Sequence, residues 1–197
     1  MEIRPVGRSA LLIEVDDPLA WFAALDAERA AGRLAVTDIV PGARTVLLDG
    51  VSSIAAVAAT LRSWPPPPRS ARDADAISIP VTFDGPDLST VARCADLSVD
   101  ALIAALTGTT FTVAFGGFAP GFAYLSGLPW SVPRLDNPRP RVPAGSVALA
   151  AEFAGIYPTA SPGGWQLVGR TDTVLFGIDR DPPALLTPGL CVRFVAS

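Results

Sequence analysis

The sequence predicts an α+β protein in two parts, a small α/β domain followed by a β-barrel domain. Four consecutive prolines, Pro65–Pro68, interrupt the chain and favour a stiff, extended spacer. Before them, strand and helix patterns alternate. After them, short apolar runs alternate with Gly and Pro, which is typical of barrels and sandwiches. We therefore expect an N-terminal domain at residues 1–64, a linker at 65–76 and a C-terminal domain at 77–197.

Alternating strands and helices in the N-terminal part indicate a small α+β sandwich of the ferredoxin-like kind. Asp17-Pro18 is typical of a helix start, because Pro suits the first helical position, and Ser52 or Ser53 is a candidate cap for a second helix. The predicted strands are Ile3–Val6, Ala10–Val15, Leu34–Val40 and Thr45–Leu48, and the first helix runs to Gly32 and the second to Leu61.

The C-terminal part opens with a predicted strand and two short helices, and then contains strands with almost no helical period. Ser98 is a candidate cap for the second of these helices. The predicted helices are Asp87–Ala95 and Ser98–Leu106, and the predicted strands are Ile77–Phe83, Phe111–Phe115, Ser146–Ala151, Gln166–Gly169, Val174–Ile178 and Val192–Val195.

Composition limits the class of protein. The 197 residues are 50% hydrophobic with a mean hydropathy of +0.41, which excludes a disordered chain. Apolar runs are interrupted well before the roughly 20 residues that a membrane span needs. The N-terminus lacks the basic start and apolar stretch of a signal peptide, so we expect a soluble, cytoplasmic protein.

Two residue types are missing from the sequence. There is no His, and all 15 residues counted as Lys or Arg are Arg. The commonest general base and zinc ligand are therefore absent, as are a P-loop lysine and any lysine that could carry biotin, and we expect no metal site. A net charge of −4 without a basic run argues against a nucleic-acid partner.

Residues 115–171 are dense in Gly, Pro, aromatic residues and Arg. Three stretches stand out: Gly117-Phe118-Ala119-Pro120-Gly121-Phe122-Ala123-Tyr124-Leu125, then Pro138-Arg139-Pro140-Arg141-Val142-Pro143-Ala144-Gly145-Ser146, then Gly155-Ile156-Tyr157-Pro158 through Ser161-Pro162-Gly163-Gly164-Trp165 to Gly169-Arg170-Thr171. Arginines in such loops can bind a carboxylate or phosphate. A Gly/Pro-rich barrel rim with solvated arginines is the alternative that composition leaves open.

These stretches resemble the family of allophanate hydrolase subunit 1, also called the KipI-like family or the family of the 5-oxoprolinase B subunit. The match is almost continuous from Phe115 to Thr171 and extends more weakly over the whole chain. The resemblance implies an N-terminal α/β domain followed by a cyclophilin-like β-barrel. The chain departs from the family pattern at Leu106, where many relatives carry a His, and at Glu152–Gly155, where relatives often read G-x-Q-T-G.

The resemblance implies one of three functions. The first, which we favour, is a subunit of ATP-dependent 5-oxoprolinase, which cleaves 5-oxo-L-proline to L-glutamate. The others are a subunit of allophanate or urea metabolism and an inhibitor of a sensor histidine kinase. Because the chain has no P-loop, Lys or His, we expect it to be inactive alone, with ATP and magnesium bound with or by its partners, subunits A and C.

Within the favoured function, Arg141 and Arg170 are candidate ligands for a substrate carboxylate or phosphoryl oxygens. Tyr157 is a candidate hydrogen-bond donor to a polarised carbonyl, and Ser161 is a candidate to orient it. The candidate substrate-binding residues are Gly117, Phe118, Gly121, Gly163, Gly164 and Trp165. Core or interface roles remain the alternative for Tyr157 and Trp165, and a surface or interface role for Arg139. Glu152 is the best-placed carboxylate near the segment.

Overall fold

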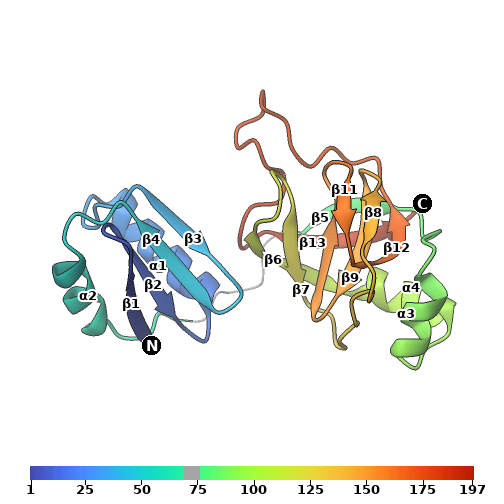
Figure 1. Cartoon of the computed structure of the whole chain (residues 1–197), viewed down its shortest axis with the longest axis horizontal. Helices are drawn as coiled ribbons and strands as arrows, with labels where there is room; N and C mark the ends of the chain where they lie inside the picture. Colours follow the sequence, from blue (N-terminus) through green and yellow to red (C-terminus); the bar gives the residue numbers. More distant parts are fainter. Residues whose placement is uncertain (69–75) are drawn as a thin grey trace. The chain divides into compact units, whose positions relative to one another are not determined.

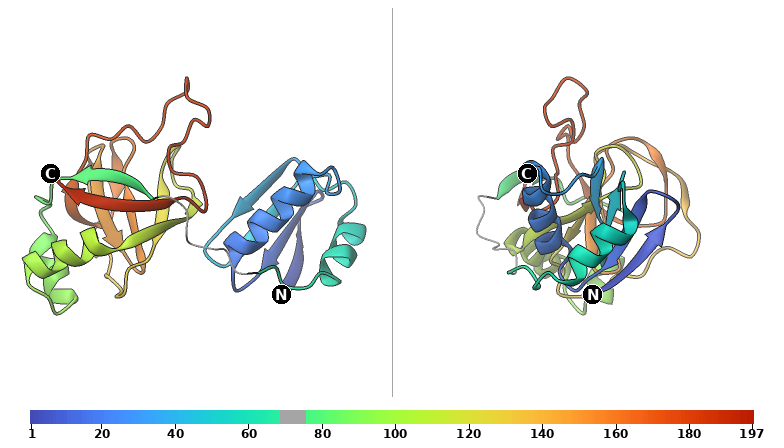
Figure 2. Two further views of the ribbon diagram at one scale, coloured as in Figure 1. Left: turned by 180° about the vertical axis from the view of Figure 1, so that it is seen from behind. Right: turned by 90° about the vertical axis from the view of Figure 1, so that its left-hand side faces the viewer.

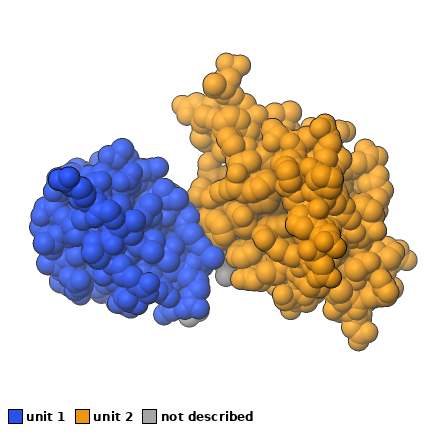
Figure 3. Space-filling view, in the orientation of Figure 1, with its two compact units in different colours: residues 1–71 blue, residues 72–197 orange. Residues whose placement is uncertain are grey.

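The computed structural model describes residues 1–68 and 76–197. The chain divides into two compact units, residues 1–71 and 72–197, which Figure 3 colours separately. Residues 69–75 of the predicted linker lie outside the described residues, so the expected boundary at residues 65–76 stays a prediction. Among the described residues, no helix combines the length and apolarity needed to cross a membrane.

The N-terminal unit is a four-stranded antiparallel sheet with two helices that share one core. Leu11 and Ile13 alternate with outward-facing residues along the second strand, and they pack against Leu25 of the first helix and Leu61 of the second. Figures 1 and 2 show the first helix lying across the sheet. The elements in chain order are β1 (Glu2–Val6), β2 (Ala10–Glu14), α1 (Pro18–Ala30), β3 (Asp38–Pro41), β4 (Thr45–Asp49) and α2 (Ile54–Arg62).

Local signals place the helix starts correctly. The Asp17 carboxylate accepts a hydrogen bond from the Ala20 amide at 3.0 Å, with Pro18 in the first turn of α1. Ser53 precedes α2, but its side chain makes no capping hydrogen bond. The third strand begins at Asp38 rather than at Leu34, because residues 33–34 are bonded back to the end of α1 through the Glu28 carbonyl.

The expected ferredoxin-like arrangement is wrong. That fold alternates as βαββαβ, whereas this unit runs ββαββα with strand order β1-β2-β4-β3. The reason is local: Gly7 adopts a φ of 60° in the connection of three residues between β1 and β2, so these strands pair with each other and no helix separates them.

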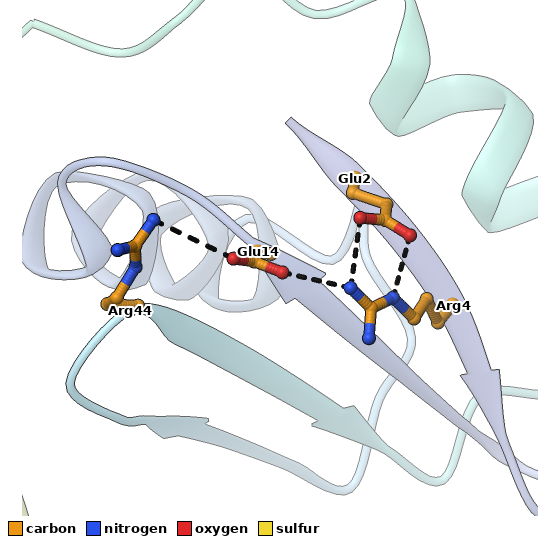
Figure 4. A network of polar contacts seen from close by, with 4 residues as sticks. All are labelled: Glu2, Arg4, Glu14 and Arg44. Carbon is orange, nitrogen blue, oxygen red and sulfur yellow. Dashed lines mark hydrogen bonds and ion pairs between the residues drawn. The ribbon is translucent and has the colours of Figure 1, made fainter.

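An exposed ion-pair network covers the β1–β2 hairpin (Figure 4). Glu2 and Glu14 lie directly opposite each other in the register, a like-charge pair that on its own disfavours pairing. Arg4 donates to both carboxylates, at 2.7 Å to Glu2 and 3.0 Å to Glu14, and Arg44 lies 3.8 Å from Glu14. Hydrogen bonding to Arg4 lowers the pKa of Glu2. The network removes a repulsion, and its exposure keeps its contribution to stability small.

The C-terminal unit is a nearly closed, barrel-like sheet with strand order β12-β9-β10-β7-β6-β13-β5, plus a two-stranded sheet of β11 and β8. All pairs are antiparallel except β13 with β5. The elements are β5 (Ile77–Val81), α3 (Leu88–Cys94), α4 (Val99–Gly108), β6 (Thr110–Gly116), β7 (Ala123–Ser126), β8 (Arg139–Val142), β9 (Ser146–Ala150), β10 (Phe153–Ile156), β11 (Ser161–Gly163), β12 (Gln166–Arg170) and β13 (Cys191–Ala196).

The sheet closes between its two edge strands. Thr82, just after β5, exchanges two backbone hydrogen bonds of 2.9 Å with Arg170 of β12. The next residues run beside β12, where the Gly85 amide donates to the Val168 carbonyl at 3.2 Å. A Cβ on Gly85 would collide with the β12 backbone, and one on Gly169 would lie 2.5 Å from the Thr82 carbonyl oxygen. Two glycines therefore permit the closure, and the expected β-barrel is confirmed as a nearly closed barrel-like sheet.

One predicted strand is wrong. Val174–Ile178 forms no strand, and within it only Phe176 makes an isolated bridge, to Ala184. Leu175 is buried, but Val174 is 67% exposed and Ile178 is 85% exposed. Its backbone pairs only with residues 183–185 of the same loop, where the Gly177 amide donates to the Pro183 carbonyl at 3.0 Å and the Leu175 carbonyl accepts from the Leu185 amide at 2.8 Å. Local propensity without a neighbouring strand of the sheet therefore does not make a strand here. In Figure 2 this segment, near the red end of the chain, extends away from the barrel.

Each unit has its own hydrophobic core, so each is expected to fold alone. Residues 1–68 and residues 76–197, expressed as separate chains, should each unfold in one cooperative urea transition followed by circular dichroism. Trp21 and Trp64, whose rings stack at 6.3 Å in the N-terminal unit, provide a second probe by fluorescence. A fragment without a cooperative transition would contradict the predicted division at residues 65–76.

Candidate aromatic cleft

A cleft of about 260 Å³ in the C-terminal unit brings the sequence motifs together. The turn after β6 supplies Phe118, the turn after β10 supplies Tyr157, and the connection between β11 and β12 supplies Gly164 and Trp165. The complete lining is Phe118, Phe122, Tyr124, Arg134, Pro138, Tyr157, Pro162, Gly163, Gly164 and Trp165. Five of the ten predicted site residues therefore meet here: Tyr157, Phe118, Gly163, Gly164 and Trp165.

The walls of the cleft are aromatic and preorganised. The Phe122 ring makes edge-to-face contacts with Tyr157 and Trp165, each at a centroid distance of 5.5 Å. Tyr124 contacts Trp165 in the same way at 5.5 Å. Phe122, Tyr157 and Trp165 are buried, and their rings pack against one another. This packing leaves each side chain few alternative rotamers, so the walls of the cleft are fixed before a ligand binds.

The Tyr157 hydroxyl remains protonated at neutral pH. Burial raises the pKa of this phenol, and a hydrogen bond with the Trp165 backbone opposes the shift. A neutral phenol keeps an O–H that can donate a hydrogen bond. A Cβ on Gly163 would collide with this hydroxyl, which explains the glycine.

Phe118 is held in a strained backbone conformation at the edge of the cleft. Its φ is 66°, a left-handed value that is costly for a bulky residue, and its side chain is 61% exposed. The ring contacts the Tyr157 ring edge-on at 6.1 Å. Strain that presents an aromatic ring to solvent is found most often at binding sites.

The three arginines singled out in the sequence have different surroundings. Arg139 donates to the Asp87 carboxylate at 2.8 Å, and the other oxygen of Asp87 accepts from the Leu167 amide at 2.7 Å. Arg139 is thus held by an ion pair within the C-terminal unit, and its predicted surface or interface role stays a prediction. Arg141 is exposed on β8 and does not line the cleft.

Arg170 also lies outside the aromatic cleft. Its Nε donates to Asp84 at 2.8 Å, and that ion pair raises the pKa of the guanidinium, although both side chains are largely exposed. Arg170 lines a different hollow of about 440 Å³ together with Thr82, Asp172 and Ser197. The structure therefore separates Arg170 from Tyr157, although the sequence motifs grouped the two residues.

The remaining candidates lie around the cleft rather than in it. The Ser161 hydroxyl is buried and has no hydrogen-bond partner among the described residues. Gly117 flanks the Tyr124 ring. Gly121 has a φ of 82°, and a Cβ at this position would lie 2.7 Å from the Cβ of Phe176, in residues 174–178. Glu152 is exposed in the turn before β10.

Arg134 lines the cleft, although no sequence pattern marked it. Its guanidinium carbon lies 6.0 Å from the centroid of the Trp165 ring. It comes from the connection between β7 and β8, a region between two recognisable motifs, and a single Arg after a Pro carries no local signal. Leu106, where relatives carry a His, is fully buried in the main core of the unit and does not line the cleft.

Comparison with known proteins gives the family. The family model for the carboxyltransferase domain, subdomains C and D, matches residues 1–186. The B subunit of 5-oxoprolinase from Escherichia coli O157:H7 is 38% identical over 203 residues, which cover 96% of this chain and 93% of that protein. The chain therefore belongs to the carboxyltransferase subdomain C and D family. The 5-oxoprolinase B subunit of Bacillus subtilis (strain 168) is another relative, 44% identical over 60% of this chain and 52% of the relative.

Solved structures share the fold. TTHA0988 superposes with a TM-score of 0.79 at 32% identity, covering 100% of this chain and 41% of that one, so this chain spans less than half of TTHA0988. PH0987 from Pyrococcus horikoshii gives a TM-score of 0.60 at 32% identity, covering 100% and 97% of the two chains. The K. lactis urea amidolyase, at 19% identity and a TM-score of 0.71 over 99% of this chain and 15% of that one, shows the fold alone.

The Asp87 carboxylate should contribute measurably to stability. Asp87→Ala removes the carboxylate that pairs with the partly buried Arg139 guanidinium and accepts from the Leu167 amide, so we expect the free energy of unfolding to fall by about 2 kcal/mol. Asp84→Ala is the matched control, since it breaks the exposed pair with Arg170 and should change the urea midpoint far less. Equal midpoints for the two variants would contradict the assignment of Arg139 to structure.

Two substitutions at Phe118 separate backbone strain from the ring. Both Phe118→Gly and Phe118→Ala remove the ring, but only Gly adopts the left-handed conformation without strain. Because that conformation costs an L-residue about 1–2 kcal/mol, we expect the Gly variant to be more stable than the Ala variant by about 1 kcal/mol in urea denaturation. Equal stabilities would show that the φ of 66° stores no strain. If both variants lose ligand or partner binding to the same extent, the loss is due to the missing Phe118 ring.

Proposed function

We propose that this chain is the B subunit of an ATP-dependent 5-oxoprolinase, which acts with subunits A and C to open 5-oxo-L-proline to L-glutamate. The observation that supports this most is the 38% identity to the Escherichia coli 5-oxoprolinase B subunit, which runs along nearly the whole of both chains. The likeness to urea amidolyase is limited to the fold, and no feature of the cleft favours urea metabolism over lactam opening.

The chemistry requires more than this chain holds. Opening the lactam breaks its C–N bond, adds the oxygen of one water to the carbonyl carbon and leaves the nitrogen protonated as an amine, while a second water cleaves ATP to ADP and phosphate. The sequence contains no His or Lys to act as base or to hold phosphates. Among the described residues, no group of three or more acidic, His or Cys side chains fits a magnesium ion. We therefore assign ATP and magnesium to the partner subunits.

What this chain can supply is recognition. The cleft offers a neutral phenol proton from Tyr157, a guanidinium from Arg134 and aromatic walls that exclude water. Hydrogen bonds of this kind polarise a carbonyl as charge develops on its oxygen. We assign the C-terminal unit the role of holding the lactam for activation by groups from the larger partner, the C subunit.

An exposed apolar surface supports a partner at this end of the unit. The side chains of Val174, Phe176 and Ile178 are 67%, 40% and 85% exposed. Gly121, in the turn that also carries the exposed Phe118, packs against the backbone of Leu175 and the side chain of Phe176. Apolar and aromatic side chains in such numbers on one exposed surface are typical of protein interfaces. We assign this surface, Phe118 with residues 174–178, to contact with the larger partner.

The test is reconstitution. The purified chain alone should neither hydrolyse ATP nor consume 5-oxoproline, whereas addition of subunits A and C should produce glutamate in an ATP-dependent manner. Ile178→Asp should weaken the complex with the larger partner by at least about tenfold, the effect of a charge in a buried apolar contact. Val6→Asp, which alters an exposed valine of the N-terminal unit, is the control and should assemble normally. Turnover by the isolated chain would refute the composite site.

A further inference from the structure

Arg134 is held opposite Trp165 by hydrogen bonds on both sides. The Pro133 carbonyl accepts from the Gln166 side-chain amide at 3.1 Å, and the Leu135 amide donates to the Gly164 carbonyl at 2.8 Å. These two bonds place residues 133–135 antiparallel to residues 164–166, with Arg134 and Trp165 facing each other. The guanidinium carbon accordingly lies 6.0 Å from the Trp165 ring centroid.

No carboxylate of residues 1–68 or 76–197 forms an ion pair with the Arg134 guanidinium. Among the residues that the structure describes, it makes no hydrogen bond and no ion pair, and the cleft lining contains no Asp or Glu. The nearby Arg139 is different, because Asp87 neutralises it. Arg134 is an exposed residue, and its guanidinium lies beside the Trp165 ring without a carboxylate partner among the described residues. The planar fork of such a guanidinium suits a carboxylate.

The other groups of the cleft limit the shape of that anion. At about 260 Å³ the cleft is smaller than the pockets that hold drug-sized molecules, which start at about 300 Å³. Phe122, Tyr124 and Trp165 present rings to it, and flat ligands bury most area against rings. The Tyr157 hydroxyl provides a proton for one acceptor oxygen. The cleft is thus built for a small, flat molecule with a carboxylate and a carbonyl.

We propose that the aromatic cleft binds a small planar carboxylate, whose carboxylate group pairs with Arg134 and whose carbonyl oxygen accepts a hydrogen bond from Tyr157. The choice of 5-oxo-L-proline as that ligand rests on the proposed function. Its carboxylate then pairs with Arg134, its lactam carbonyl accepts from Tyr157, and its ring lies against Trp165. Arg134, rather than Arg141 or Arg170, is then the residue that selects for the carboxylate.

Binding to the full chain, followed by NMR shifts of the Gly163, Gly164 and Trp165 amides, tests the proposal. The probes are 5-oxo-L-proline, 2-pyrrolidinone, which lacks the carboxylate, and allophanate. Arg134→Met should weaken 5-oxoproline binding about tenfold or more, on the scale of a lost charge-assisted hydrogen bond, and leave 2-pyrrolidinone unchanged. Arg141→Met, an exposed arginine outside the cleft, should bind like the unmodified chain.

The same variants in the complex with subunits A and C separate this inference from the proposed function. Arg134→Met should raise KM for 5-oxoproline about tenfold with a smaller effect on kcat, because it removes a contact of the bound substrate. If the chain binds allophanate through Arg134 but does not bind 5-oxoproline, the cleft is a carboxylate site as inferred, and the assignment to 5-oxoprolinase is wrong. Normal turnover with KM unchanged in Arg134→Met would uphold the function and overturn the inference. Absence of shifts with every carboxylate, in the chain and in the complex, would also overturn it.

Discussion

The Asp87 carboxylate joins the parts of the C-terminal unit on which the cleft depends. One oxygen accepts from Arg139 of β8 and the other from the Leu167 amide of β12, while the Asp87 amide donates to the Leu167 carbonyl at 3.0 Å. The carboxylate is 12% exposed, so its bonds to these two donors replace lost hydration. It thereby fixes the beginning of β12, which follows Trp165 and starts at Gln166. The Gln166 side-chain amide in turn donates to the Pro133 carbonyl, next to Arg134.

The arginines show how environment divides one residue type among roles. Arg139 is partly buried and neutralised, which makes it structural, while Arg170 is exposed and paired with Asp84 at the closure of the barrel. The Arg134 backbone is fixed by hydrogen bonds at Pro133 and Leu135, and its exposed side chain keeps its charge uncompensated within the described residues. In a chain of net charge −4, an uncompensated cation in a cleft without carboxylates is the feature that points to an anionic ligand.

The glycines and the strained Phe118 show what close packing around the cleft demands. Gly163 leaves room for the Tyr157 hydroxyl, and Gly85 and Gly169 let two backbones approach where the barrel closes. Phe118 takes a left-handed φ of 66° although it is bulky, and its ring stays largely exposed. The three glycines follow from sterics inside the unit, whereas backbone strain at an exposed aromatic residue such as Phe118 is typical of a binding site.

The sequence by itself determined the elements with strong local signals and the composition of the site. Asp17-Pro18 and Ser98 marked helix starts because a cap acts within a few residues, and the motifs between Phe115 and Thr171 marked the family and five residues of the cleft. Only the tertiary structure decided the strand order β1-β2-β4-β3, the absence of a strand at Val174–Ile178 and the separation of Arg170 from Tyr157. It also placed Arg134 opposite Trp165 across 31 positions of sequence (165 − 134), through hydrogen bonds at Pro133 and Leu135. These features depend on partners far apart in the chain, and no local propensity encodes which distant backbone a segment will meet.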